Sequence, residues 1–172
     1  KKIEKLINQI IADFDFEEPS NSIILLANLY KEIGKIENNH WKKIKLKEVR
    51  DIIKGCLGLR LQFNSSVESG VDKTKISTEL IASNSSNFEI ELIDVDGALN
   101  IDVSKKLSNN QVWNVNKNLS ITDAVTTPYW LLEEKDLGNY KLKNKNLIGL
   151  AETPNPIKIY FNFKIQEVQI PI

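Results

Sequence analysis

Apolar residues in the first third of the chain recur at the three- and four-residue spacing of amphipathic helices. A first helix near the N-terminus is followed by a break at Asp13–Ser20, which holds Pro19 and acidic residues, and by a second helix. A third helix begins after Asn38-Asn39-His40 and ends at Gly55 and Gly58. The second helix is apolar on more than one side, which predicts contact from several directions, including a domain outside this sequence.

From Leu59 onward, apolar and polar residues alternate, which is the pattern of half-buried strands. Asp96-Gly97 lies between two alternating segments and predicts a two-residue hairpin turn. The predicted fold is α+β, with two or three N-terminal helices over residues 1–58 and an antiparallel β-sandwich of about seven strands over residues 59–172. Beyond the strand that starts at Leu59, strands are expected at residues 71–83, 88–95, 98–103, 111–121, 128–132, 139–142 and 157–170.

The composition argues against several classes of function for this chain. The chain has 172 residues, 41% of them hydrophobic and 27% charged, as in an ordinary globular domain. The 23 basic and 23 acidic residues cancel, so no global field favours nucleic acid or an anionic membrane. No apolar run reaches the roughly 18 residues that a membrane span needs. The chain starts at Lys1 and contains no Met, which suggests a segment of a longer protein.

Few residues are candidates for catalysis or metal binding. His40 is the only histidine and Cys56 the only cysteine, so a zinc site lacks ligands and any nucleophile–histidine pair would need His40 as its base. We expect His40 to lie in a surface turn and Cys56 to be a buried, inert thiol. An acidic cluster follows Trp130 and offers general-acid or cation-binding groups, but we expect it to be solvated; it consists of Glu133, Glu134 and Asp136.

Three aromatic residues are the candidate ligand-binding residues: Trp113, Tyr129 and Trp130. If they are exposed on one face of the sandwich, they form a platform for stacking on sugar rings. Aromatic side chains also dominate sandwich cores and domain interfaces, and we favour this packing interpretation. Burial of the three rings would support packing, whereas at least two coplanar exposed rings beside Asn, Asp or Glu would support glycan binding.

Three short motifs resemble a known family. They are Thr127-Pro128-Tyr129-Trp130-Leu131, Gly138-Asn139-Tyr140 and Asn146–Pro154, which contains Leu147-Ile148-Gly149. Together with Cys56–Leu59, they resemble the region that follows the catalytic domain in large bacterial PIG-L family deacetylases. The resemblance covers most of the chain from about residue 20.

That resemblance implies a parent enzyme that removes an N-acetyl group from an amino sugar with a metal-bound water, zinc being the expected metal. The family's Ala-His-Pro-Asp-Asp-Glu run is absent from this sequence, so no catalytic or metal-binding residue carries over and no cofactor is expected here. The resemblance implies a non-catalytic accessory module that packs on its parent's catalytic domain, and we expect the helices to form that contact. We also expect a periplasmic or secreted bacterial protein, although cysteine usage leaves the compartment open.

Two alternatives to the accessory module remain open. The first is a carbohydrate-binding module that carries the parent enzyme to glycans through the aromatic residues. The second is a stand-alone hydrolase that uses the carboxylates at 133–136, which requires a deep pocket and a carboxylate of raised pKa.

Overall fold

The three predicted helices are present. A computed structural model describes residues 1–122, 126–134 and 136–172. The short 3₁₀ helix η1 begins at Pro19, where the fixed φ of proline suits the first position of a helix. Asn39 caps α3 because its side chain accepts a 2.8 Å hydrogen bond from the Lys42 backbone N–H. The bounds are α1 Lys2–Ala12, η1 Pro19–Ser22, α2 Ile23–Gly34 and α3 His40–Cys56.

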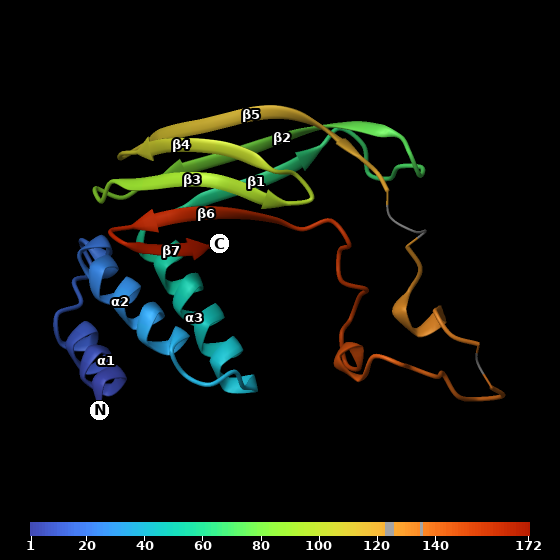
Figure 1. Cartoon of the computed structure of the whole chain (residues 1–172), viewed down its shortest axis with the longest axis horizontal. Coiled ribbons are helices and arrows are strands. Elements are labelled where there is room, and N and C mark those ends of the chain that lie inside the picture. The colour runs from blue at the N-terminus through green and yellow to red at the C-terminus, as the bar shows by residue number, and fades with distance from the viewer. Residues whose placement is uncertain (123–125, 135) are drawn as a thin grey trace.

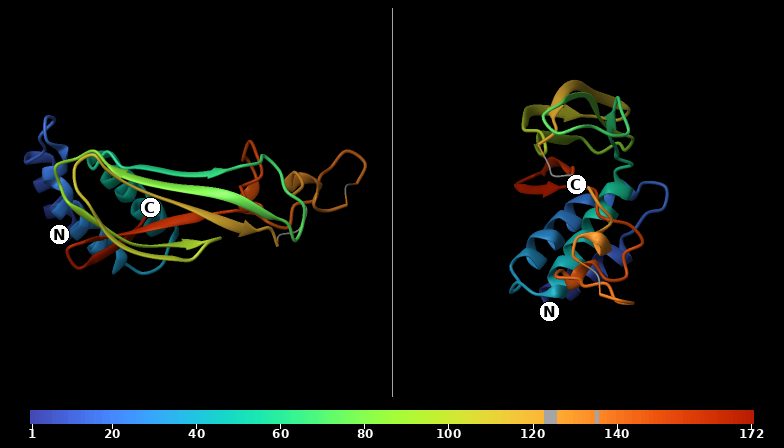
Figure 2. Two further views of the ribbon diagram at one scale, coloured as in Figure 1. Left: turned by 90° about the horizontal axis from the view of Figure 1, so that it is seen from above. Right: turned by 90° about the vertical axis from the view of Figure 1, so that its right-hand side faces the viewer.

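Seven strands form two antiparallel sheets, so the predicted α+β fold with about seven strands is confirmed. One sheet has the order β1-β2-β5 and the other β4-β3-β6-β7. Figure 1 and the right-hand view of Figure 2 show the strands in two layers, with the helices to one side. The bounds are β1 Arg60–Ser65, β2 Lys75–Asn84, β3 Ile90–Gly97, β4 Ile101–Leu107, β5 Gln111–Ser120, β6 Ile159–Ile165 and β7 Val168–Pro171.

The core lies between the two sheets and is set by strand register. In the first sheet Ala82 lies between Leu61 and Trp113, and in the next inward-facing row Leu80 lies between Phe63 and Val115. The second sheet contributes fully or almost fully buried apolar residues from its two central strands: Ile90, Leu92, Val95, Phe161, Phe163 and Ile165. Alternation along each strand therefore places one side chain in two in a shared core.

The helices pack on the β6–β7 side of the sandwich. Helix α2 contacts both of these strands as well as α1 and α3. Arg50 on α3 donates a hydrogen bond of 3.2 Å to the backbone oxygen of Pro171. The two-sided hydrophobicity of α2 is therefore accounted for by neighbours within this chain, although Ile24 and Ile36 remain exposed.

The predicted boundary at Gly58-Leu59 coincides with the junction between α3 and β1. Gly58 has a positive φ of 57°, which ends the helix and turns the chain into the sheet. Leu57 and Leu59 on either side are buried, and the core cluster runs continuously from the helices into both sheets.

Two predicted strands were wrong. Residues 129–131 of the predicted strand 128–132 form a 3₁₀ helix, η2 (Tyr129–Leu131), and residues 139–142 contribute only one isolated bridge, Asp136–Asn139. These segments are short and lie between proline- and glycine-containing turns, where the backbone hydrogen bonds are local rather than shared with a sheet.

Two turn predictions also differ from the structure. The predicted strand 157–170 is a hairpin of β6 and β7, because Ile165 pairs with Val168 across a turn in which Gln166 has a φ of 53°. Asp96-Gly97 is not the two-residue hairpin turn. Both residues continue β3 and pair with Tyr160 and Ile159 of β6, and residues 96–100 join the Val95–Ile101 pair.

Gly97 is the position where we expect the backbone to tolerate substitution least. Its φ is +107°, and a Cβ there would lie 2.3 Å from the Lys158 carbonyl oxygen. We predict that backbone strain in Gly97→Ala lowers the free energy of unfolding by about 1–3 kcal/mol. Urea titration followed by circular dichroism measures this.

Gly55→Ala is the matched control, because nothing lies within 4 Å of its Cβ position inside α3. It should raise stability by about 0.5–1 kcal/mol, since alanine favours a helix over glycine. Equal effects of the two substitutions would contradict the strain at Gly97.

Candidate functional site

The three short motifs that resemble the deacetylase family lie in one segment, the long connection between β5 and β6. We call residues 121–158 the β5–β6 connection; its described parts are 121–122, 126–134 and 136–158. It contains η2 and a second 3₁₀ helix, η3 (Lys145–Leu147). In Figures 1 and 2 the orange trace of this connection extends beyond the end of the sandwich.

Tyr129 holds the first motif against the third. Its side chain is only 8% exposed, and its hydroxyl donates a 2.9 Å hydrogen bond to the backbone oxygen of Leu150. The Tyr129 backbone N–H donates to the Thr153 hydroxyl at 2.9 Å, and that hydroxyl donates to the Thr127 backbone oxygen at 3.3 Å. Three hydrogen bonds therefore join segments that are more than twenty residues apart in sequence.

The motif glycines shape the same segment. Gly138 and Gly149 have φ values of 83° and 89°, which glycine adopts without the steric cost that other residues incur. Gly138 lies in the turn closed by the reciprocal backbone hydrogen bonds of Asp136 and Asn139, at 3.1 and 3.2 Å. These motif residues therefore serve to fold the connection.

Several large apolar side chains of the connection are exposed to solvent. Six of them are more than two fifths exposed: Leu131, Leu132, Leu137, Tyr140, Ile148 and Leu150. A concentration of large apolar residues at the surface is typical of an interaction site. A separate set of exposed apolar side chains lies on α1 and the residues after it: Ile7, Ile11, Phe14 and Phe16.

The three aromatic candidates do not form one platform. Trp113 lies on the inward face of β5, opposite Ala82, and packs against the core. Tyr129 and Trp130 are adjacent in η2, with ring centroids 4.9 Å apart and an interplanar angle of 83°. The two neighbouring rings are thus nearly perpendicular rather than coplanar.

Trp130 does line a hollow of about 390 Å³ at the base of the connection. Three prolines, three threonines and one carboxylate line it with the indole: Thr126, Thr127, Pro128, Glu152, Thr153, Pro154 and Pro156. A single partly exposed indole beside a carboxylate is a modest sugar-stacking site, since sugar affinity in such sites comes largely from aromatic contact area.

The acidic cluster is engaged in surface ion pairs. Glu133 lies 2.7 Å from the Lys143 ammonium and Asp136 lies 2.8 Å from that of Lys141. Exposed pairs of this kind organise a loop locally and contribute little to stability. No group of three or more His, Cys, Asp or Glu side chains suited to a metal ion occurs among residues 1–122, 126–134 and 136–172.

The predicted exposure of His40 agrees with the structure, whereas the predicted burial of Cys56 agrees only in part. His40 is exposed at the first position of α3, with its ring edge-to-face against Trp41. Cys56, at the last position of α3, is half-buried rather than fully buried, and burial raises the pKa of its thiol. A raised pKa lowers the thiolate fraction at neutral pH, so Cys56 is a weaker nucleophile than a free cysteine.

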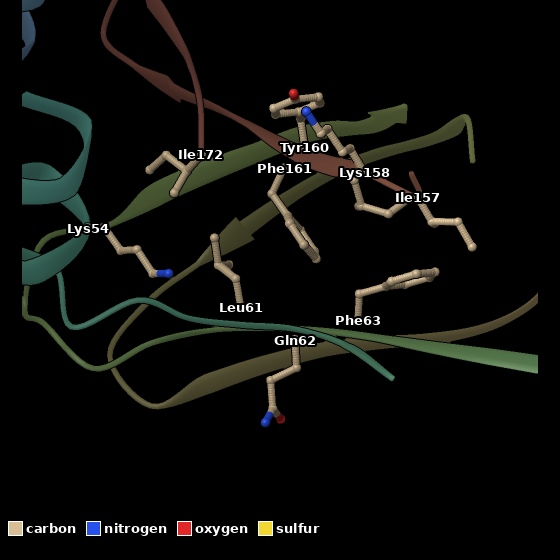
Figure 3. Close-up of a pocket in the computed structure, with 10 residues that line it drawn as sticks. Lys54, Leu61, Gln62, Phe63, Ile157, Lys158, Tyr160, Phe161 and Ile172 are labelled. Atoms are coloured by element: carbon tan, nitrogen blue, oxygen red, sulfur yellow. The ribbon is translucent and has the colours of Figure 1, made fainter. Parts of the chain in front are cut away.

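The sequence analysis missed one further hollow, of about 390 Å³, at the edge of the sandwich between β1 and β6 (Figure 3). Leu61, Phe63 and Phe161 in its apolar wall belong to strands that the alternating pattern predicted, and they pack against the core. No strand in the described part of the chain covers them; this depends on which strands pair, and no local sequence pattern encodes the pairing.

Comparison with protein-family models, with curated proteins and with solved structures gives no match for this chain. The resemblance to PIG-L family deacetylases therefore stays a prediction from the motifs. None of the helices in the described part of the chain is both long and apolar enough to cross a lipid bilayer.

The hydrogen bonds of Tyr129 generate a prediction for the connection. Tyr129→Phe removes the hydroxyl that binds the Leu150 oxygen, so we expect a local loss of about 1 kcal/mol. Amide hydrogen exchange around residues 148–153 should accelerate about fivefold, while exchange in the β2 and β3 amides should not change.

Tyr140→Phe is the control, because Tyr140 is 56% exposed and its hydroxyl forms no hydrogen bond with the described residues. If both variants accelerated exchange equally, Tyr129 would have no special part in folding the connection.

Proposed function

We propose that this chain is a non-catalytic accessory module that docks on the catalytic domain of a PIG-L-like N-deacetylase through its β5–β6 connection. One observation carries the proposal. The residues of the family-like motifs divide into those that fold the connection, such as Tyr129 and Gly138, and those that remain exposed and apolar, such as Leu131 and Ile148. A shaped, internally bonded segment with an apolar surface suits a fixed interface.

Charge in the connection supports the same interpretation. Two of its carboxylates, those of Glu133 and Asp136, are paired with lysines of the connection itself, which lowers the unpaired charge beside the exposed leucine and isoleucine side chains. Interface cores are depleted in charged residues and depend on apolar and aromatic side chains. A domain surface that covers these residues gains free energy from the area it buries.

We assign no catalytic step to this chain. A zinc-dependent deacetylase is expected to bind its metal through carboxylate and histidine side chains. Among the described residues, no group of three or more His, Cys, Asp or Glu side chains could hold a metal ion. Zinc and the hydrolytic water belong, in this proposal, to the catalytic domain. The partner is that domain, and neither nucleic acid nor membrane is part of the proposal.

Glycan binding is the second candidate function, and the hollow beside Trp130 favours it. The indole offers one stacking face, and Glu152 and Thr127 offer hydrogen-bonding groups at its rim. This candidate requires a glycan-array signal that Trp130→Ala abolishes, whereas the accessory-module proposal expects no such signal.

The docking proposal is tested on the protein expressed from its complete reading frame. We expect that frame to encode an Ala-His-Pro-Asp-Asp-Glu run and the protein to release acetate from N-acetylglucosamine compounds. The double variant Leu132→Ser with Ile148→Ser should release the connection from the catalytic domain. Each substitution removes about 1.5–3 kcal/mol of binding free energy if the side chain is buried in the interface. Amide hydrogen exchange of residues 126–134 and 136–158 should then accelerate at least tenfold.

Val71→Ser is the matched control, since Val71 is 73% exposed in the β1–β2 loop, outside the proposed interface. It should leave exchange in the connection unchanged. A reading frame without the run would remove the family assignment, and equal exchange in the double variant and the control would remove the docking surface.

A further inference from the structure

The hollow between β1 and β6 is an apolar groove at an open edge of the sandwich. Leu61 and Phe63 form one wall, and Ile157 and Phe161 form the other. In Figure 3 these side chains point into a common space, whereas Gln62 points away from it. Lys54 of α3 reaches into one end, beside Ile172. We call this feature the edge groove.

Strand β1 presents unused backbone groups at this groove. It pairs with β2 on one side only. Ser66 donates its N–H to the Ser77 oxygen at 3.0 Å, and hydrogen-bonded pairs alternate with non-hydrogen-bonded pairs in an antiparallel ladder. Leu61 and Phe63 lie at the non-hydrogen-bonded positions, so their N–H and C=O groups point away from β2 to the open edge.

Strand β6 has a similar opening on the other wall. Phe161 exchanges two 3.0 Å backbone hydrogen bonds with Ile172, at the end of the β6–β7 ladder. The N–H and C=O of Ile159, two residues earlier, point to the same side. No strand of the described chain lies there. The groove is thus apolar inside and bordered along β1 by backbone donors and acceptors that no strand among the described residues uses.

The charged side chains that line the groove are all basic. Its ten lining residues include Lys54 and Lys158 and no aspartate or glutamate. Neither lysine forms an ion pair with another residue in the described part of the chain. A ligand that fills the groove is therefore favoured if it places a carboxylate at the α3 end, beside the Lys54 ammonium.

We propose that the edge groove receives an extended peptide strand of a partner protein, with alternate apolar side chains in the groove and an acidic side chain beside Lys54. The strand would run antiparallel to β1, the commoner arrangement, so that its C-terminal end meets Lys54. Its backbone would bond to Leu61 and Phe63 while every second side chain fills the apolar space. This inference does not rest on the proposed docking of the connection, although Ile157 and Lys158 belong to both surfaces.

The probe is a capped synthetic hexapeptide, Thr-Val-Thr-Val-Thr-Glu, titrated into the protein with isotope-detected NMR. We expect shift changes at Leu61, Phe63 and Ile159. The valines oppose Leu61 and Phe63, so their N–H groups would bond to β1, while the N–H groups of the second and third threonines would point outward. N-methylation of both valines should weaken binding about tenfold or more, and N-methylation of those threonines should have little effect.

Charge reversal tests the orientation. Lys54→Glu should weaken the glutamate peptide about three- to tenfold and should favour a peptide that ends in lysine instead. Lys164→Glu is the matched control, because Lys164 is exposed on β6 outside the groove. Lys164→Glu should change the affinity of the protein for neither the glutamate peptide nor the lysine peptide.

Several outcomes would overturn the proposal. Equal binding of the two N-methylated peptides would show apolar filling without strand pairing, and absence of any shift at the groove would show no peptide site. Sedimentation that reports a dimer of the free protein, disrupted by Phe63→Asp, would make a second copy the occupant in place of a partner strand. Circular dichroism of each variant confirms that it is folded.

Discussion

The contact between the helices and the β6–β7 side of the sandwich determines the layout of the rest of the molecule. Two stacked sheets leave their apolar interior open along the outer strands, and each open side must be covered. Helices α2 and α3 cover this side where β7 extends β6, and Leu57 and Leu59 continue the core across the junction. Beyond the Phe161–Ile172 pair no helix or strand among the described residues covers it, and there the edge groove begins.

The helices and most strands could be predicted because local sequence patterns determine them. The apolar stripe of α1, the Asn39 cap of α3 and the alternation of β2 are all readable within one element. The same alternation gave a wrong prediction where pairing between strands decides the position of a turn. Residues 157–170 alternate through the β6–β7 turn, and only the Ile165–Val168 pairing reveals a hairpin.

The candidate site was harder to predict because its contacts join distant residues. The motif at Tyr129 suggested an aromatic platform, yet its hydroxyl and backbone N–H bond to Leu150 and Thr153. Trp113, which the sequence grouped with it, faces the core because β5 pairs with β2 in a register that places it beside Ala82. A single sequence gives composition and period, whereas these positions depend on long-range register.

The edge groove and the β5–β6 connection share a boundary at Ile157. This residue is near the end of the connection, just before β6, and its side chain forms part of the groove wall. Its backbone N–H is held at 3.0 Å by the Asn155 side chain, which fixes the path by which the connection returns to the sheet. A strand in the groove would therefore contact the last residues of the connection, so that the two surfaces meet at Ile157.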